Sequence, residues 1–121
     1  MKKPVLVIED DRDIREPIQE LLQDEGFTVV CSSSGVEALE LLEKQNLAPG
    51  IILCDLMMPH MNGIDFVQNL KQRQMHDASR AVVLLSASND IDTTAEKLGV
   101  GHLRKPIDLD LLIKKVHQYC D

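Results

Sequence analysis

Aromatic residues are scarce in this chain of 121 residues, which has no tryptophan, one tyrosine and two phenylalanines. Its core must therefore consist mainly of leucine, isoleucine, valine and methionine. The scarcity also argues against recognition of single-stranded nucleic acid by stacking of bases on aromatic side chains. Long apolar runs are absent as well, because no stretch of the sequence is long enough to span a bilayer.

Basic residues are outnumbered by acidic ones, 13 to 20, which gives a net charge of −7. This charge disfavours non-specific binding to nucleic acid or to anionic membranes, so neither is expected as a partner. The cysteines are Cys31, Cys54 and Cys120, and an odd, widely spaced set of three does not indicate disulfides or a metal site. The set is typical of free thiols in the reducing cytoplasm, where we expect the protein to be.

The stretch Ile51–Asp55 is an apolar run of strand length that ends in a carboxylate. Continuous aliphatic residues without alternation are typical of a parallel strand that is buried on both faces. We therefore expect Asp55 at the carboxyl edge of a sheet, where open α/β folds bind their ligands. Asn62 is better placed to cap the following helix, so helix capping does not account for Asp55.

Strand-like runs alternate with helical patterns along the whole chain. The expected strands are residues 5–8, 27–31, 51–55, 81–85 and 101–104, and the polar segment 76–80 is expected to be an irregular connection. Alternation of this kind predicts a parallel sheet with helices on both faces. The expected fold is a flavodoxin-like, doubly wound (βα)5 domain over residues 1–121 with strand order 2-1-3-4-5.

Polar residues at the starts of the helical patterns predict where the helices begin. Asp13 and Glu16 have the spacing of a capping box for the first helix. The second helix is expected to reach about Gln45. The later helices are expected to begin at residues that accept hydrogen bonds from the first turn: Ser34, Asn62, Asn89 or Asp90, and Asp108.

In the expected strand order, functional groups from several strand ends meet at one edge of the sheet. Glu9 and Asp10 follow the first strand, Asp55 ends the third, Ser86 follows the fourth and Lys105 the fifth. Three neighbouring carboxylates repel one another unless one is protonated or a cation joins them, and oxygen-only ligands suit Mg²⁺. A lysine and a hydroxyl beside the metal indicate a bound anion, and a phosphoryl group on Asp55 fits all of these groups.

These residues, together with the loop Asp55-x-x-Met58-Pro59-x-Met61-Asn62-Gly63, resemble the CheY-like receiver domain of two-component response regulators. The resemblance extends from Val5 into the last helical segment. It implies that Asp55 accepts a phosphoryl group from a histidine kinase or a histidine phosphotransfer protein. It also implies a signalling domain rather than an enzyme, limited to self-phosphotransfer and autodephosphorylation.

The resemblance further implies a role for each residue around Asp55. Mg²⁺ (or Mn²⁺) would be bound by Asp55, Asp10 and the backbone carbonyl of Met57, with Glu9 acting largely through water. Ser86 would be the switch hydroxyl. Lys105 would contact the phosphate, and the bond from Lys105 to Pro106 is expected to be cis.

The family also suggests where the signal leaves the domain. An unknown downstream protein is expected to bind the face formed by the fourth helix, the fifth strand and the fifth helix, and the sequence leaves formation of a homodimer open. Within residues 1–121 we expect no effector domain beside the receiver. We therefore expect a single receiver domain, either stand-alone or cut from a larger regulator, whose output runs through another protein or through a missing domain.

Two departures from the family pattern concern the switch and the choice of partner. His102 stands three residues before Lys105, where receivers usually carry a Tyr or Phe that turns inward on activation. We interpret His102 as a tolerated substitution rather than as a pH sensor. The segment from Ser86 to Lys105 is a few residues shorter than usual, which trims the fourth helix or its loop.

Two other functions remain as alternatives. A haloacid-dehalogenase-like phosphatase also uses a strand-end aspartate with Mg²⁺, but that family has a second aspartate two residues later, where this chain has Met57. A receiver-like scaffold would bind partners without phosphorylation. Such scaffolds usually lose the acid pair, the acceptor or the lysine, all of which are present here, and His102 is the feature that keeps this alternative open.

Overall fold

The computed structural model describes residues 2–121 and shows one parallel sheet of five strands. The strands run in the order β2-β1-β3-β4-β5, which confirms the predicted fold class and strand order. Their bounds are β1 (Val5–Ile8), β2 (Val29–Ser32), β3 (Ile51–Asp55), β4 (Val82–Ser86) and β5 (Gly101–Arg104).

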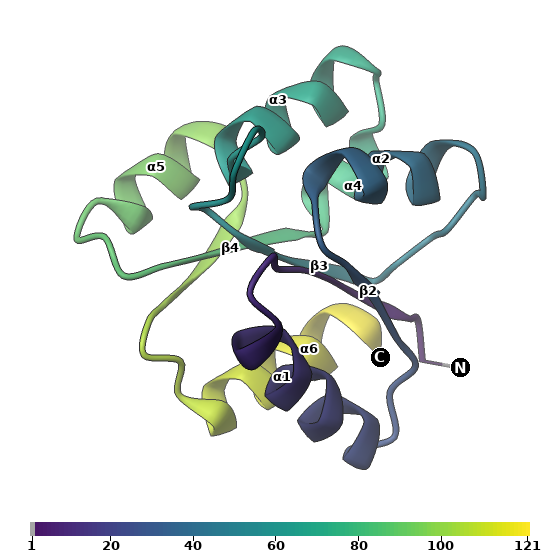
Figure 1. Ribbon diagram of the computed structural model, residues 1–121, viewed down its shortest axis with the longest axis vertical. Coiled ribbons are helices and arrows are strands. Elements are labelled where there is room, and N and C mark those ends of the chain that lie inside the picture. Colours follow the sequence, from purple (N-terminus) through teal and green to yellow (C-terminus); the bar gives the residue numbers. More distant parts are fainter. Residues whose placement is uncertain (1) are drawn as a thin grey trace.

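Helices cover both faces of the sheet (Figure 1). On one face lie α1 (Arg12–Asp24) and α6 (Leu109–Cys120). The other face carries α2 (Gly35–Glu43), α3 (Gly63–Gln72), α4 (His76–Arg80) and α5 (Ile91–Leu98). The sheet therefore has a hydrophobic core on each face. Side chains of β1 alternate between the two cores: Leu6 and Ile8 pack on the α2 side, whereas Val5 and Val7 pack on the α1 side.

The prediction of an irregular connection at residues 76–80 was wrong, because these residues form the short helix α4. One helical turn satisfies its backbone, since Ser79 N donates to Met75 O at 3.0 Å and Ala81 N donates to Asp77 O at 3.2 Å. The segment has no glycine or proline to prevent this. Ala81 is thereby held by α4, and β4 begins one residue later than predicted.

Other boundaries also differ from the prediction, since β2 ends at Ser32 and β4 at Ser86, each one residue later than expected. The strand β2 begins at Val29 rather than residue 27, because Phe27 N donates to Leu22 O at 3.0 Å and so still closes the end of α1. Gly26 permits this helix ending because it adopts a left-handed backbone conformation, with a φ of +92°. The helix α2 ends at Glu43 instead of reaching Gln45.

The capping box predicted at Asp13 and Glu16 was also wrong, because α1 begins earlier. Asp11 is its N-cap, and the Asp11 carboxylate accepts a hydrogen bond from Asp13 N at 2.9 Å. Glu16 instead pairs with Arg12. The other caps are confirmed at Ser34, Asn62 and Asp108, whose side chains accept from the first turns of α2, α3 and α6, whereas Asp90 occupies the N-cap position of α5 without a side-chain hydrogen bond.

Strand register brings the carboxyl ends of the strands to one edge. Ile8 is paired with Cys54, Asp55 with Leu85, and Ser86 with Arg104. The residues that follow these positions, including Glu9 and Lys105, therefore lie together. Among residues 2–121, none of the helices combines the length and the apolar composition needed to cross a membrane.

Candidate functional site

Three carboxylates meet at the carboxyl edge of the sheet. One oxygen from each of Glu9, Asp10 and Asp55 lies within 4.8 Å of the others. Glu9 is 1% exposed and Asp55 is 5% exposed, because both directly continue fully buried strands, whereas Asp10 is exposed. The structure thus brings together the acidic residues that the sequence placed at two neighbouring strand ends.

Lys105 is the cation of this cluster. Its Nζ lies 3.3 Å from Oδ1 of Asp55 and 3.8 Å from Oε2 of Glu9. The lysine is held at the end of β5, since Lys105 N donates to Ser86 O at 2.9 Å. The bond from Lys105 to Pro106 is cis, as predicted.

The charge of Lys105 does not fully compensate the burial of Glu9 and the negative charge of the neighbouring Asp55. Its Oε1 accepts a hydrogen bond from Asp11 N at 3.2 Å, but its buried Oε2 has no hydrogen-bond partner among the described residues. Burial, followed by the neighbouring Asp55 carboxylate, raises the pKa of Glu9 to about 8. A buried carboxylate without a partner binds a proton or a cation, and this all-oxygen donor set fits a hard divalent cation such as Mg²⁺.

Two further predicted residues, Ser86 and Met57, adjoin the cluster, and a third, His102, stands apart from it. Ser86 is 3% exposed at the end of β4, and its Oγ accepts a hydrogen bond from Ser88 N at 3.0 Å. Met57 N donates to Asp55 Oδ1 at 3.2 Å, while the Met57 side chain is exposed. His102 lies half-buried within β5, paired with Leu84, and so stands before the strand end rather than in the acidic cluster.

Sequence reasoning did not identify Arg15, which supports the acidic residues from α1. Its Nη1 donates to the backbone carbonyl of Glu9 at 2.7 Å. The contact spans the turn between β1 and α1, and it fixes the peptide that joins Glu9 to Asp10. Only the position of Arg15 four residues after the helix cap Asp11 could have suggested that it reaches back to this turn.

Comparison with known proteins gives a consistent result. Residues 5–117 match the family described as the response regulator receiver domain. The chain is 28% identical to the sporulation initiation phosphotransferase F of Bacillus subtilis, covering 98% of this chain and 94% of that protein. It covers only 23% to 55% of the length of several longer regulatory proteins that it also resembles.

Solved structures agree with these matches. The receiver domain of the Francisella response regulator 1452 has a TM-score of 0.84 at 30% identity, covering 97% of this chain and 95% of that one. The chemotaxis protein CheY4 of Vibrio cholerae has a TM-score of 0.83 at 26% identity, covering 98% and 99%. The match over residues 5–117, with the acids at the ends of β1 and β3 and the lysine after β5, shows that the chain belongs to the receiver domain family of two-component response regulators.

Proposed function

We propose that Asp55 accepts a phosphoryl group from a histidine kinase or a histidine phosphotransfer protein, and that this modification switches the binding of a downstream protein. One observation carries the proposal. The buried Asp55 carboxylate has the Lys105 ammonium 3.3 Å away and the Glu9 and Asp10 carboxylates within 4.8 Å. This arrangement can hold both a cation and a phosphoryl group next to a nucleophile.

The phosphoryl transfer follows from these positions. A carboxylate oxygen of Asp55 attacks the phosphorus of a phosphohistidine, the bond from phosphorus to the imidazole nitrogen breaks, and that nitrogen keeps the electron pair. Lys105 moves its ion pair from the carboxylate to an oxygen of the phosphoryl group. Glu9, Asp10, Asp55 and the carbonyl of Met57 would hold Mg²⁺ (or Mn²⁺), which neutralises negative charge on the phosphoryl oxygens.

Beyond accepting and losing this group, we propose no enzymatic activity for the domain. Autodephosphorylation would be hydrolysis of the aspartyl phosphate, in which a water oxygen attacks phosphorus and the Asp55 carboxylate leaves. Met57, two residues after Asp55, is 75% exposed, and we propose that water approaches the site along this segment. In this account, the lifetime of the phosphoryl group depends on this access.

Ser86 is the proposed switch hydroxyl. Its oxygen accepts from Ser88 N, so its hydrogen is available to donate to a phosphoryl oxygen. Phosphorylation adds roughly −1.5 to −2 charges and strong acceptors, which would draw Ser86 and the adjoining loop toward Asp55. That loop leads into α5, so the proposed movement changes the face formed by α5, β5 and α6. Two copies could also associate through this face.

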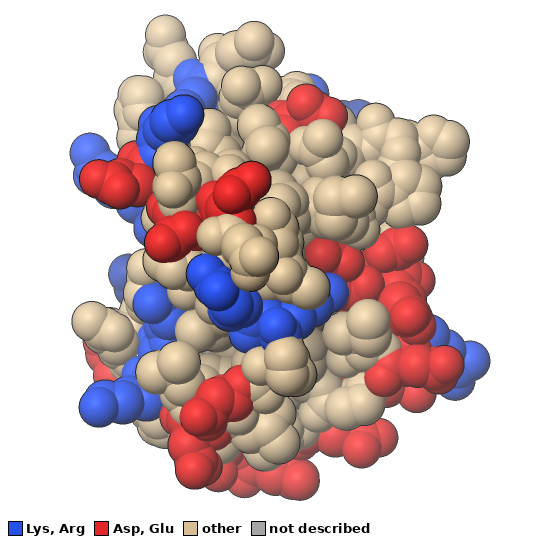
Figure 2. Space-filling view, turned by 90° about the vertical axis from the view of Figure 1, so that its left-hand side faces the viewer, with Lys and Arg blue, Asp and Glu red and all other residues tan. Residues whose placement is uncertain are grey.

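The face proposed for the downstream partner differs in charge from the protein as a whole. Figure 2 views the molecule from the side that carries α5, and a band of basic side chains crosses it between acidic groups. The helix called fourth in the prediction corresponds to α5, because α4 is an additional helix. His102 lies in β5, the strand of this face, where we propose that it takes the place of the usual aromatic switch residue.

The experiment that tests the proposal is intact-mass analysis after incubation with acetyl phosphate. One phosphoryl adduct is expected with Mg²⁺ and none with a chelator. Asp55→Asn should abolish the adduct, whereas the matched control Asp92→Asn, on exposed α5, should retain it. An adduct on Asp55→Asn protein, or none on the wild type, would contradict the proposal. We further propose that the domain acts in the cytoplasm, with its output carried either by another protein or by a further domain of a larger regulator.

A further inference from the structure

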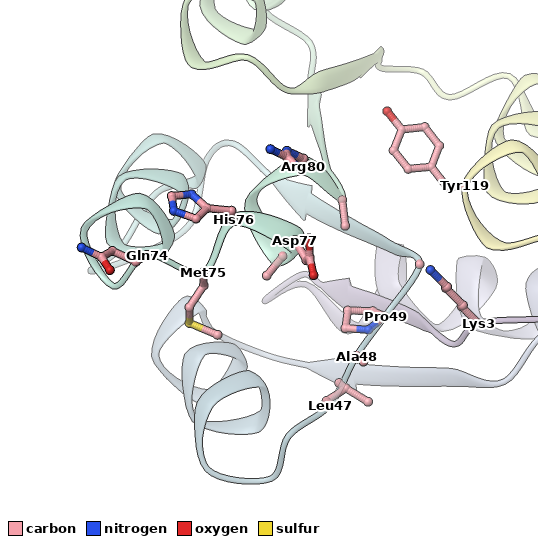
Figure 3. A pocket seen from close by; sticks show the side chains of 13 residues that line it. Lys3, Leu47, Ala48, Pro49, Gln74, Met75, His76, Asp77, Arg80 and Tyr119 are labelled. Carbon is pink, nitrogen blue, oxygen red and sulfur yellow. The ribbon is translucent and has the colours of Figure 1, made fainter.

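A cavity of about 600 Å³ lies at the edge of the sheet opposite the acidic cluster (Figure 3). Its walls include residues near the starts of three strands: Gly50 and Ala81 immediately precede β3 and β4, and Lys3 lies two residues before β1. None of its lining residues belongs to the proposed phosphorylation site. The volume is in the range of small-molecule binding sites, which is about 300 to 1,000 Å³.

The walls of the cavity are held in place by backbone hydrogen bonds, two of which join distant segments. Lys3 N donates to Cys120 O at 3.0 Å, and Gly50 N donates to Pro4 O at 2.9 Å. Met75 N donates to Leu70 O at 2.9 Å. The cavity is therefore formed before any ligand arrives, which lowers the entropic cost of binding.

An unusual backbone conformation also lies in this region. Gln74, in the connection between α3 and α4, has a φ of +59°, and Asn46, next to the lining residue Leu47, has a φ of +55°. Residues other than glycine adopt this left-handed region at a cost in free energy, and glutamine is less suited to it than asparagine. Strained positions of this kind concentrate at functional sites, so the conformation of Gln74 supports a functional role for the cavity.

The charge of the cavity is opposite to that of the protein. Lys3, Arg80 and His76 line it with only one acid, Asp77, in a chain whose net charge is −7. Within residues 2–121, the side chains of Lys3 and Arg80 form no hydrogen bond or ion pair. Figure 3 shows Arg80 and Asp77 on the α4 side of the cavity, with Lys3 and Tyr119 on the opposite side. Two unpaired cations therefore line the space from different walls, which makes it favourable for an anion.

The other lining residues can contact a ligand larger than an inorganic ion. Leu47, Pro49 and Met75 offer apolar contact, while the Tyr119 hydroxyl and the Asp77 carboxylate can bond to hydroxyl groups. We propose that this pocket binds a small organic phosphate, with its phosphoryl group at Arg80 and Lys3 and its hydroxyl-bearing body against Asp77 and Tyr119. This site is independent of phosphorylation at Asp55.

Titration of ¹⁵N-labelled protein, followed by the backbone amide signals, tests this proposal. The probes are glucose 6-phosphate and AMP, with glucose, adenosine and inorganic phosphate as partial ligands at matched ionic strength. Saturable shifts are expected from at least one organic phosphate at residues 47–50 and 74–81, with at least tenfold weaker binding of its neutral counterpart and of inorganic phosphate. Signals around Asp55 should stay in place, which separates this result from the fate of the phosphorylation proposal.

Charge-removing variants complete the test. Arg80→Gln and Lys3→Gln should each weaken binding of the responding probe at least tenfold, whereas Lys97→Gln, on α5 away from the cavity, should not. All three side chains are exposed, so the variants should fold like the wild type, which their amide spectra will show. The proposal is overturned if neither organic phosphate gives saturable shifts, if inorganic phosphate binds as tightly, or if the three variants respond alike.

Discussion

The Nζ of Lys105 lies 3.3 Å from Oδ1 of Asp55, which is the nearest cation contact of the proposed phosphoacceptor in the described chain. Removal of this cation should slow transfer to Asp55, because the lysine is placed to stabilise the added phosphoryl charge. For Lys105→Gln we expect the rate of adduct formation from acetyl phosphate to fall roughly 10- to 100-fold. Time-resolved intact-mass analysis measures this rate, with Lys97→Gln as a control that should keep the wild-type rate.

Glu9 should make the stability of the metal-free protein fall as pH rises. Its pKa is about 8 in the folded protein and near the usual 4.5 of a glutamate when unfolded. Between these values the folded state binds the proton more tightly, so the free energy of unfolding decreases with pH, by at most about 1.4 kcal/mol per pH unit. Denaturant unfolding at pH 5, 6.5 and 8 in the presence of a chelator measures this slope.

The Glu9→Gln variant isolates this effect, because every other titrating group is shared with the wild type. The wild-type free energy of unfolding should fall relative to the variant from pH 5 to pH 8, and Mg²⁺ should restore more stability at pH 8 than at pH 5. Parallel pH profiles for the two proteins would show that Glu9 is not the buried acid described here.

Arg15 should influence the acidic cluster although it contributes no ligand to it. Loss of its 2.7 Å hydrogen bond to Glu9 O releases the turn that positions Glu9 and Asp10. We expect Arg15→Ala to lower the free energy of unfolding by about 0.5–1.5 kcal/mol and to weaken Mg²⁺ binding. Arg12→Ala is the matched control, because Arg12 pairs with Glu16 on the exposed surface and should change both quantities little. Equal effects of the two variants would contradict a role for Arg15 in placing the turn.

Gly63 has no room for a side chain beneath the loop that follows Asp55. A Cβ there would lie 2.9 Å from Leu84 Cδ2, 3.1 Å from Leu56 Cα and 3.2 Å from Asp55 O, and backbone atoms cannot move aside cheaply. We expect Gly63→Ala to cost about 1–3 kcal/mol of stability and to slow phosphorylation by shifting Asp55. Chemical denaturation and the acetyl phosphate reaction measure the two effects.

Gly99→Ala provides the comparison for this glycine. Nothing lies within 4 Å of a Cβ at Gly99, but its φ of +72° strains any other residue, so stability should fall by about 1–2 kcal/mol. Its rate of phosphorylation should remain that of the wild type. If the two alanine variants slow phosphorylation equally, the effect of Gly63→Ala arises from general destabilisation.

The parts of the fold that the sequence predicted correctly are those whose pattern is local. The runs Val5–Ile8 and Ile51–Asp55 are buried on both faces, and continuous apolar sequence is the direct consequence of that burial. Strand order then placed Glu9, Asp55 and Lys105 together without any further information. Helix starts were predicted well where one polar residue dominates, as at Asn62 and Asp108.

Other features depend on contacts that no local pattern contains. The helix α4 has a single buried residue, Ser79, so it shows no apolar stripe. Asp11 competes with Asp13 as the cap of α1, and only the position of the chain after β1 decides between them. The contact of Arg15 with Glu9 O and the cavity between Lys3 and Arg80 both need segments brought together by the fold.

The most direct measurement of the central claim is to trap the phosphorylated residue chemically. Borohydride reduces an aspartyl phosphate to homoserine, so protein treated with acetyl phosphate and Mg²⁺ and then reduced can be digested and mapped by mass spectrometry. Our account predicts homoserine at position 55 and at no other position. Homoserine at position 10, or an unmodified Asp55 in protein that carries a phosphoryl group, would contradict it.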